Sequence, residues 1–138
     1  MKNNNVNMNS SLQFKGYTVN HLFFENKEST NNSYNVMPEL MSEIKFEDDK
    51  KFSVVLGCKI EPTEENPFPF SLEVIITGNF EVECSDSNYD TLVNKNSVAI
   101  LFPYLRSTIS MLTLNANKTP LVLPTVNIVK MLEKLDEV

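Results

Sequence analysis

The stretch 97-SVAILFPYLRSTISMLTLN-115 organises the rest of the chain. Its apolar residues recur every three or four positions, which predicts an amphipathic helix, here with two apolar surfaces. The first surface is the stripe of Val98, Leu101, Phe102, Leu105, Ile109 and Leu112. The second lies almost opposite and consists of Ile100, Tyr104 and Met111. We expect the first to pack on the chain's own sheet and the second to form an oligomer interface with another copy.

The sequence also predicts where this helix begins and ends. Ser97 is a residue type preferred at the N-cap, and Pro103 lacks the N–H of a helix interior, so we expect the helix to begin at Ser97 and to kink or restart at Pro103. The preceding segment, SDSNYDTLVNKN (85–96), is predicted to be a loop with room for one helical turn. The helix is expected to end within residues 115–118, and a short last helix to begin at Thr125.

Four stretches before the helix have the apolar and β-branched pattern of strands. They are Leu12 to Phe24, Tyr34 to Phe46, Phe52 to Ile60 and Phe70 to Cys84. The alternation of the first stretch slips near Gly16 and His21, where β-bulges would restore it. Pro38 cannot donate a ladder hydrogen bond, so the second strand begins near it or runs along a sheet edge. The fold class is therefore α+β: a four-stranded antiparallel sheet with two helices packed on one face and an acidic, solvated opposite face.

The composition restricts the class of protein and its partners. A chain of 138 residues predicts one domain, residues 11–138, after a flexible Asn-rich tail, residues 1–10. The net charge of −6 argues against a nucleic-acid partner, because phosphate binding needs clustered Lys and Arg. No apolar run approaches the roughly 20 residues of a membrane helix, and the N-terminus lacks the apolar core of a signal peptide. We expect a cytoplasmic protein without membrane insertion.

Residues for catalysis or metal binding are scarce. The only glycines are Gly16, Gly57 and Gly78, which leaves no glycine-rich loop for phosphates. His21 is the single histidine and has no companion of metal-ligand spacing. Cys58 and Cys84 lie in apolar strand patterns and are interpreted as small core residues, in preference to a disulfide or a reactive thiol. The sequence predicts a protein without enzymatic activity, cofactor or metal.

Two motifs give the chain a family resemblance. The run AILFPYLR (99–106) opens the long helix, and PLVLPTVN (120–127) leads into the last helix. Weaker matches in the strands are Tyr17-Thr18, Phe24-Glu25, Pro38-Glu39-Leu40, Phe70, Glu73-Val74, Gly78 and Phe80. With these residues, the chain resembles the SecB family of protein-export chaperones over residues 12 to 135.

The resemblance implies an ATP-independent chaperone that binds unfolded client polypeptides, such as preproteins, and needs no cofactor. It also implies a homotetramer built as a dimer of dimers, with the long helices sandwiched inside. The client-binding groove of the family is formed by the second strand, the crossover and the last helix. Here the groove residues would be Leu40, Ile44, Phe46, Leu121, Leu123, Val126, Ile128, Met131, Leu132 and Leu135.

Many SecB proteins hand their clients to the SecA motor, which docks on an acidic patch of the exposed sheet face. Glu25 and Glu73 match this patch, but another acidic place falls at Asn20 or His21, and the chain stops at Val138 without the family's motor-gripping tail. We therefore expect SecA to bind weakly or not at all. Two alternatives stay open: a SecB-like chaperone dedicated to the antitoxin of a toxin–antitoxin system, and a non-chaperone oligomeric interaction protein.

Overall fold

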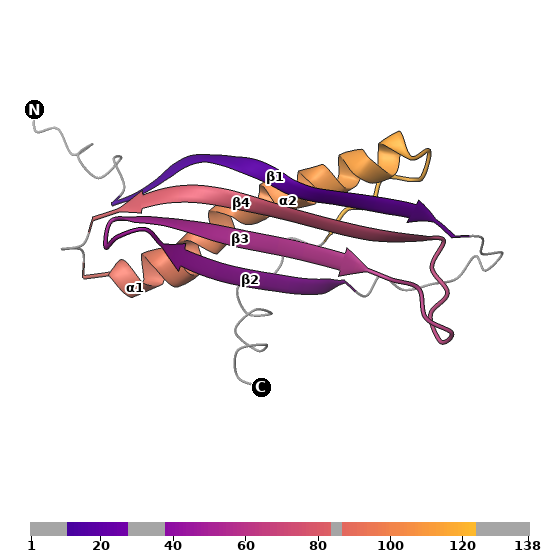
Figure 1. The fold of residues 1–138 in the computed structure, drawn as a ribbon, viewed down its shortest axis with the longest axis horizontal. Helices are drawn as coiled ribbons and strands as arrows, with labels where there is room; N and C mark the ends of the chain where they lie inside the picture. Colours follow the sequence, from indigo (N-terminus) through magenta and orange to yellow (C-terminus); the bar gives the residue numbers. More distant parts are fainter. Residues whose placement is uncertain (1–10, 28–37, 84–86, 124–138) are drawn as a thin grey trace, which may run out of the picture.

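Four antiparallel strands form one sheet in the order β1-β4-β3-β2. The computed structural model describes residues 11–27, 38–83 and 87–123. The strands are β1 (Leu12–Asn26), β2 (Glu39–Phe46), β3 (Lys51–Ile60) and β4 (Phe70–Val82). A long helix crosses one face of the sheet diagonally, from below β2 to beyond β1 (Figure 1). The α+β class and the four-stranded antiparallel sheet are confirmed; the last helix expected from Thr125 lies outside the described residues.

The central strands β3 and β4 form the floor of the core. Their side chains alternate between the helix face and the open face, and Val54, Val74 and Ile76 on the helix face are 0% exposed. Glu73 and Thr77, which alternate with them on β4, lie on the open face. The sheet is therefore covered by the helix on one side, as the alternation predicts.

The first strand β1 contains both predicted irregularities. Its register against β4 shifts between Phe14 and Tyr17 and again between Val19 and His21. Gly16 lies in the first shift with φ +111°, a conformation that residues with a Cβ rarely adopt. After each bulge the apolar side chains return to the helix face, so β1 keeps an apolar face over its 15 residues.

The helix begins earlier than predicted. A short α1 (Tyr89–Thr91) and a π-helical segment η2 (Leu92–Asn96) run directly into α2 (Ser97–Asn115). The predicted N-cap is therefore wrong: Ser97 has helical φ and ψ, is buried, and donates its hydroxyl to the carbonyl of Val93 at 2.5 Å. Together these segments give 27 helical residues, which by length and composition alone could cross a membrane. Their apolar stripe is instead packed on the sheet.

The proline inside the helix does not end it. α2 continues through Pro103 for its full 19 residues, so the predicted restart is wrong. Pro103 offers no N–H to the carbonyl of Ala99, one turn earlier. Both residues are exposed, so water can solvate the freed carbonyl and the helix can tolerate the proline.

The predicted stripe of α2 is confirmed as the contact with the sheet. Leu101, Leu105 and Ile109 are 0% exposed, and Leu112 packs partly buried against the same core. The sheet accommodates Leu101 at Gly78, where an added Cβ would lie only 2.7 Å from the Leu101 Cδ1 atom. A side chain at this strand position would therefore force the Leu101 side chain to shift within the packed core.

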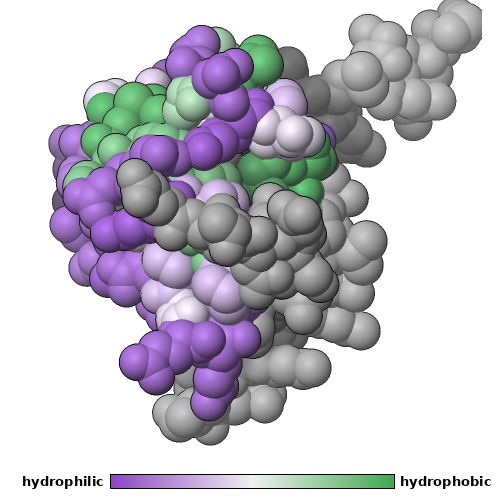
Figure 2. All heavy atoms as spheres, turned by 90° about the vertical axis from the view of Figure 1, so that its right-hand side faces the viewer, coloured by the Kyte–Doolittle hydropathy of each residue, from purple (hydrophilic) through white to green (hydrophobic). Residues whose placement is uncertain are grey.

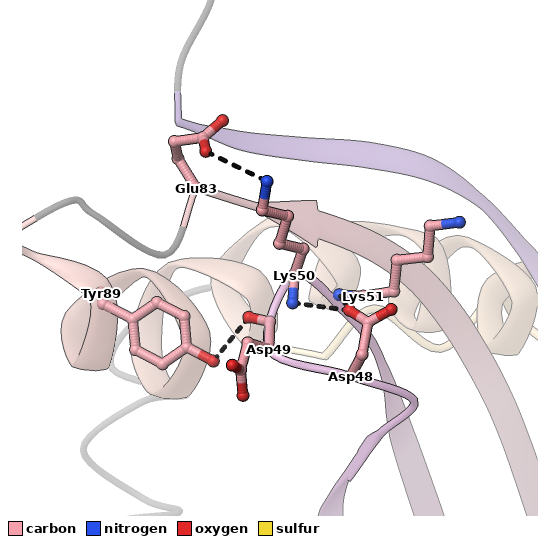
Figure 3. Close-up of polar contacts among 6 residues, drawn as sticks. All are labelled: Asp48, Asp49, Lys50, Lys51, Glu83 and Tyr89. Carbon is pink, nitrogen blue, oxygen red and sulfur yellow. Dashed lines mark hydrogen bonds and ion pairs between the residues drawn. The ribbon is translucent and has the colours of Figure 1, made fainter.

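A hydrogen bond to the β2–β3 hairpin holds the beginning of the helix in place (Figure 3). The Tyr89 hydroxyl donates to the carbonyl of Asp49 at 2.9 Å. Beside it, the Asp48 carboxylate accepts the backbone N–H groups of Lys50 and Lys51 at 2.7 and 2.8 Å. These backbone hydrogen bonds, that from Lys50 first, hold the pKa of Asp48 below its ordinary value of 3.8. The side chain of Asp48 thus holds the β2–β3 turn in shape, and this turn binds the beginning of the helix through Asp49.

The end of α2 is confirmed and has a defined cap. Asn117 adopts φ 62°, in the left-handed region. Its N–H donates to the Leu114 carbonyl and the Lys118 N–H donates to the Thr113 carbonyl, both at 3.0 Å. This pair of bonds is the Schellman motif, in which asparagine is the common alternative to glycine. The chain then turns back along the helix as an irregular connector, residues 119–123.

Candidate functional site

An apolar strip lies along the helix-side face of the edge strand β2. It consists of Leu40, Ile44 and Phe46, and we call it the β2 strip. Leu40 and Ile44 are half-buried and pack against the core. Phe46 is 56% exposed, with its ring centroid 5.8 Å from that of Phe52. The structure thus brings the three groove residues predicted on this strand to one accessible edge.

Two side chains of the helix hold the connector that follows it. The Ser110 hydroxyl donates to the Leu121 carbonyl at 2.7 Å, and the Leu121 N–H donates to the Thr113 hydroxyl oxygen at 2.9 Å. Leu121, a predicted groove residue, is half-buried and packs against the core. Sequence reasoning did not assign Ser110 and Thr113 any role in the site. The only sequence feature that indicates this contact is the three-residue spacing of Ser110 and Thr113 on one helix face, shortly before the connector.

Leu123 is not a groove residue. It is 2% exposed and belongs to the hydrophobic core, whereas its neighbour Val122 is 66% exposed. The family resemblance places Leu123 in the groove as part of the crossover, but in this structure its side chain lies inside the core and is closed to a client. The other predicted groove residues, Val126, Ile128, Met131, Leu132 and Leu135, lie outside the described residues.

The second apolar surface of α2 is exposed in the protomer. Ile100 is 38%, Tyr104 37% and Met111 60% exposed, and Leu114 one turn further is 58% exposed. These side chains turn away from the sheet that covers the opposite stripe. Ile100, Tyr104 and Met111 are the residues predicted to form an oligomer interface, and that interface stays a prediction.

Strand β1 adds to this surface, which sequence reasoning missed. Tyr17, Val19 and Leu22 lie on the helix face of β1 and are 40%, 38% and 52% exposed. The ring of Tyr104 lies 5.2 Å from that of Phe14, so the helix and the strand meet there. Figure 2 views the molecule from the end where α2 finishes; hydrophobic atoms gather in the upper part of this end, and hydrophilic atoms cover its left and lower parts.

The predicted docking carboxylates on the open sheet face each contact a side-chain nitrogen of a neighbouring residue. Glu25 pairs with Lys27, and Glu73 contacts the Nε2 atom of His21 at 2.9 Å. Lys15 lies 3.2 Å from a carboxylate oxygen of Glu81 in the same way. The open face is therefore a mixture of both charges, which weakens its attraction for a basic partner.

The thiol of Cys58 lies in the hydrophobic core. It is buried, and burial raises its pKa to about 12, which keeps it protonated and unreactive. This agrees with its predicted place as a small core residue. Over residues 11–27, 38–83 and 87–123, no group of three His, Cys, Asp or Glu side chains could hold a metal ion.

The comparisons with known proteins bear on this geometry. The family model described as Preprotein translocase subunit SecB matches residues 5–136. The chain belongs to the SecB family. An uncharacterized protein of Methanocaldococcus jannaschii is 33% identical over 134 residues, 93% of this chain and 86% of that protein. The predicted family is therefore confirmed over nearly the whole chain.

A solved structure of a SecB-like chaperone shares this fold at low sequence identity. The SecB-like chaperone Rv1957 of Mycobacterium tuberculosis, solved in complex with a peptide from the HigA1 antitoxin, is 12% identical and has a TM-score of 0.66. The match covers 87% of this chain and 91% of Rv1957. A protein of unknown function from Streptococcus agalactiae is also 12% identical, with a TM-score of 0.49. This match covers 82% of this chain and 96% of the Streptococcus agalactiae chain. The likeness to Rv1957 shows that this chain has the fold of a SecB-like chaperone.

Proposed function

We propose that this SecB-family protein is an ATP-independent holdase that binds non-native polypeptides along the β2 strip. The observation that carries the proposal is the exposure of Phe46, at 56%, beside the half-buried Leu40 and Ile44 at a sheet edge. Water-exposed apolar side chains along one face of a strand attract other apolar surfaces. A folded protein hides such surfaces, whereas an unfolded client presents them.

The rest of the proposed groove comes from the connector and the segment after it. Leu121 is held beside the helix by Ser110 and Thr113 and supplies a half-buried apolar side chain. In the proposal, the groove continues through Val126, Ile128, Met131, Leu132 and Leu135. Leucine and methionine side chains adapt to clients of different sequence, which suits a chaperone with varied clients.

We also propose that the working form is a cytoplasmic homotetramer. The exposed surface of Ile100, Tyr104 and Met111 supports an assembly, because burial of such side chains against another copy removes apolar area from water. A dimer of dimers with these helices inside would leave the β2 strip of each protomer on the outside. The assembly and the client site would then use different faces of the molecule.

The test of holdase activity is an aggregation assay. A model protein is denatured by heat, and its light scattering is followed with increasing amounts of the chaperone, with and without ATP. The proposal expects the same delay of aggregation in both conditions. Equal aggregation with and without the chaperone would reject holdase activity, and a delay only with ATP would reject the ATP-independent mechanism.

The client class remains to be chosen between exported preproteins and an antitoxin. A structural neighbour in the family, Rv1957, was solved with an antitoxin peptide, which supports an antitoxin as the second candidate. Glu25 and Glu73 are exposed, which supports the proposal that SecA binds weakly: each ion pair that an exposed carboxylate forms with a basic partner is worth only about 0–1 kcal/mol and is screened by salt. A titration with the host's SecA at physiological salt should show no sub-micromolar binding; tight binding would favour export.

A further inference from the structure

A row of aromatic rings crosses the helix face of the sheet from one edge to the other, and we call it the aromatic row. Its members lie directly opposite one another on the four strands: Phe46 on β2, Phe52 on β3, Phe80 on β4 and Phe14 on β1. Neighbouring ring centroids lie 5.8, 5.4 and 5.2 Å apart in this order. Aromatic pairs at such separations attract each other. The four rings therefore form one continuous series of contacts to which every strand contributes.

The helix extends the aromatic row to the proposed oligomer surface. The ring of Tyr104 on α2 lies 5.2 Å from that of Phe14 and 4.8 Å from that of Tyr17. Tyr104 and Tyr17 are 37% and 40% exposed, on the surface where another copy is proposed to pack. At the other end of the row, Phe46 is 56% exposed in the β2 strip. The two surfaces that the proposed function uses are thus joined by one chain of neighbouring rings.

The two middle rings of the row have no space for independent movement. Phe80 is 1% and Phe52 3% exposed, and their rings are stacked with 13° between the ring planes. In a core packed as densely as an organic crystal, one ring can shift only if its neighbours shift with it. The rings at both ends are open to water in the protomer. A partner that covers either end therefore restricts the rings along the whole row.

We infer that client binding at the β2 strip and assembly at the proposed oligomer surface favour each other through the aromatic row, an inference that rests on the proposed holdase and tetramer. An exposed ring loses conformational freedom when a partner covers it, and this loss opposes binding. Once one end is fixed, the ring at the other end has less freedom left to lose, so the second partner binds more tightly. By linkage, assembly raises the client affinity by the same factor by which the client favours assembly.

A buried ring outside the row provides a matched control. Phe70 is 4% exposed and stacks on Phe24, with 5.0 Å between the ring centroids. It is the first residue of β4, whereas Phe80 lies near the end of the same strand, so the two rings are far apart. Phe70→Leu and Phe80→Leu therefore remove the same atoms from buried positions of one strand, and only Phe80→Leu interrupts the aromatic row.

The first experiment compares the client affinity of the assembled and the dissociated protein. The probe is a short synthetic peptide that alternates valine with lysine and threonine, and its binding is followed by fluorescence anisotropy. The dissociated form is Met111→Lys, or the unchanged protein diluted below its assembly concentration, and sedimentation velocity measures the mass of each sample. The assembled form should bind the peptide at least about fivefold more tightly, which is the lower end of typical coupling between two sites.

The second experiment interrupts the aromatic row. Phe80→Leu and the control Phe70→Leu are each measured in the assembled and the dissociated form, and urea denaturation establishes that both are folded. Phe52→Leu, which also interrupts the row, takes the place of Phe80→Leu if that variant does not fold. The ratio of the two affinities should fall below about twofold in Phe80→Leu and stay at about fivefold or more in Phe70→Leu.

Three results would count against these proposals, each at a different level. Equal affinities of the assembled and the dissociated unchanged protein, or an unchanged protein of monomer mass, would overturn the coupling while holdase activity stands. Equal affinity ratios in Phe80→Leu and Phe70→Leu would overturn the role of the aromatic row. A peptide that binds neither form, together with a failed aggregation assay, would reject the proposed function itself.

Discussion

The ring of Tyr104 on α2 lies 4.8 Å from the ring of Tyr17 on β1, with 40° between the ring planes. Aromatic pairs at this separation attract each other beyond the effect of area burial alone. The pair joins the outward face of the helix to the edge of the sheet. Because both side chains are still more than a third exposed, the joined surface has apolar area left for another copy to cover.

Replacing Met111 with Lys should dissociate the assembly and leave each protomer folded. Met111 is 60% exposed in the protomer, but a lysine there would become an unpaired buried charge in the interface. Light scattering should give about four times the 15.7 kDa chain mass for the unchanged protein and a lower mass for the variant. Met111→Leu keeps an apolar side chain of similar volume at this position, so this control variant should keep the assembly. An unchanged protein of monomer mass at micromolar concentration would contradict the prediction.

Leu123→Asp should unfold the protein more readily than Val122→Asp. Leu123 is 2% exposed and Val122 is 66% exposed, so the two neighbours receive the same charge in opposite surroundings. Burial of an unpaired carboxylate should lower the free energy of unfolding by at least about 3 kcal/mol, and the exposed change should cost less than about 0.5 kcal/mol. Urea denaturation measures both values. Equal losses would show that Leu123 is outside the core.

Thr113→Val should release the connector from the helix. The hydroxyl oxygen of Thr113 accepts the Leu121 N–H at 2.9 Å, and valine keeps the shape without the acceptor. The free energy of unfolding should fall by about 1–3 kcal/mol, and the Leu121 amide should exchange its hydrogen faster. Thr108→Val is the control, because that hydroxyl donates only within the helix, to the Tyr104 carbonyl. If Leu121 exchanges at an unchanged rate in Thr113→Val, the hydroxyl does not hold the connector.

Much of this fold was predictable because its signals are local. The alternation of β3 and β4, the slips at Gly16 and His21, and the buried stripe containing Leu101 each depend on residues close in sequence. Their consequences are fixed by the two-residue period of a strand and the 3.6-residue period of a helix. The exposure of Ile100, Tyr104 and Met111 opposite the stripe was predictable for the same reason.

The features that the sequence did not predict depend on contacts between residues far apart in sequence. The early helix start is supported by the bond from Tyr89 to Asp49, which lies 40 residues away in sequence. Leu123 has the same sequence pattern in a core as in a groove, and only packing distinguishes the two. The share of β1 in the exposed surface depends on two bulges and on the contact of Tyr17 with Tyr104. Local patterns contain none of this information.

The β2–β3 hairpin should make stability depend on pH. The pKa of Asp48 is lowered by the backbone hydrogen bonds from Lys50 and then Lys51. A lowered folded-state pKa gives stability that is present above the ordinary value of 3.8 and lost as the pH falls through the lower folded value. The difference in melting temperature between the unchanged protein and Asp48→Ala should therefore be larger at pH 7 than at pH 2. A difference that stays constant over this range would contradict the assignment.

The central claim, that clients bind on the β2 strip, is tested most directly by two neighbouring substitutions on this strand. Phe46→Asp places a charge in the strip at a side chain that is 56% exposed, so the protein should stay folded. Lys45→Asp introduces the same residue on the opposite face of β2. The measurement is the affinity for a reduced, permanently unfolded model protein, by isothermal titration calorimetry without ATP. The account predicts a loss of at least about tenfold for Phe46→Asp and little change for Lys45→Asp; equal affinities for the two variants and the unchanged protein would contradict it.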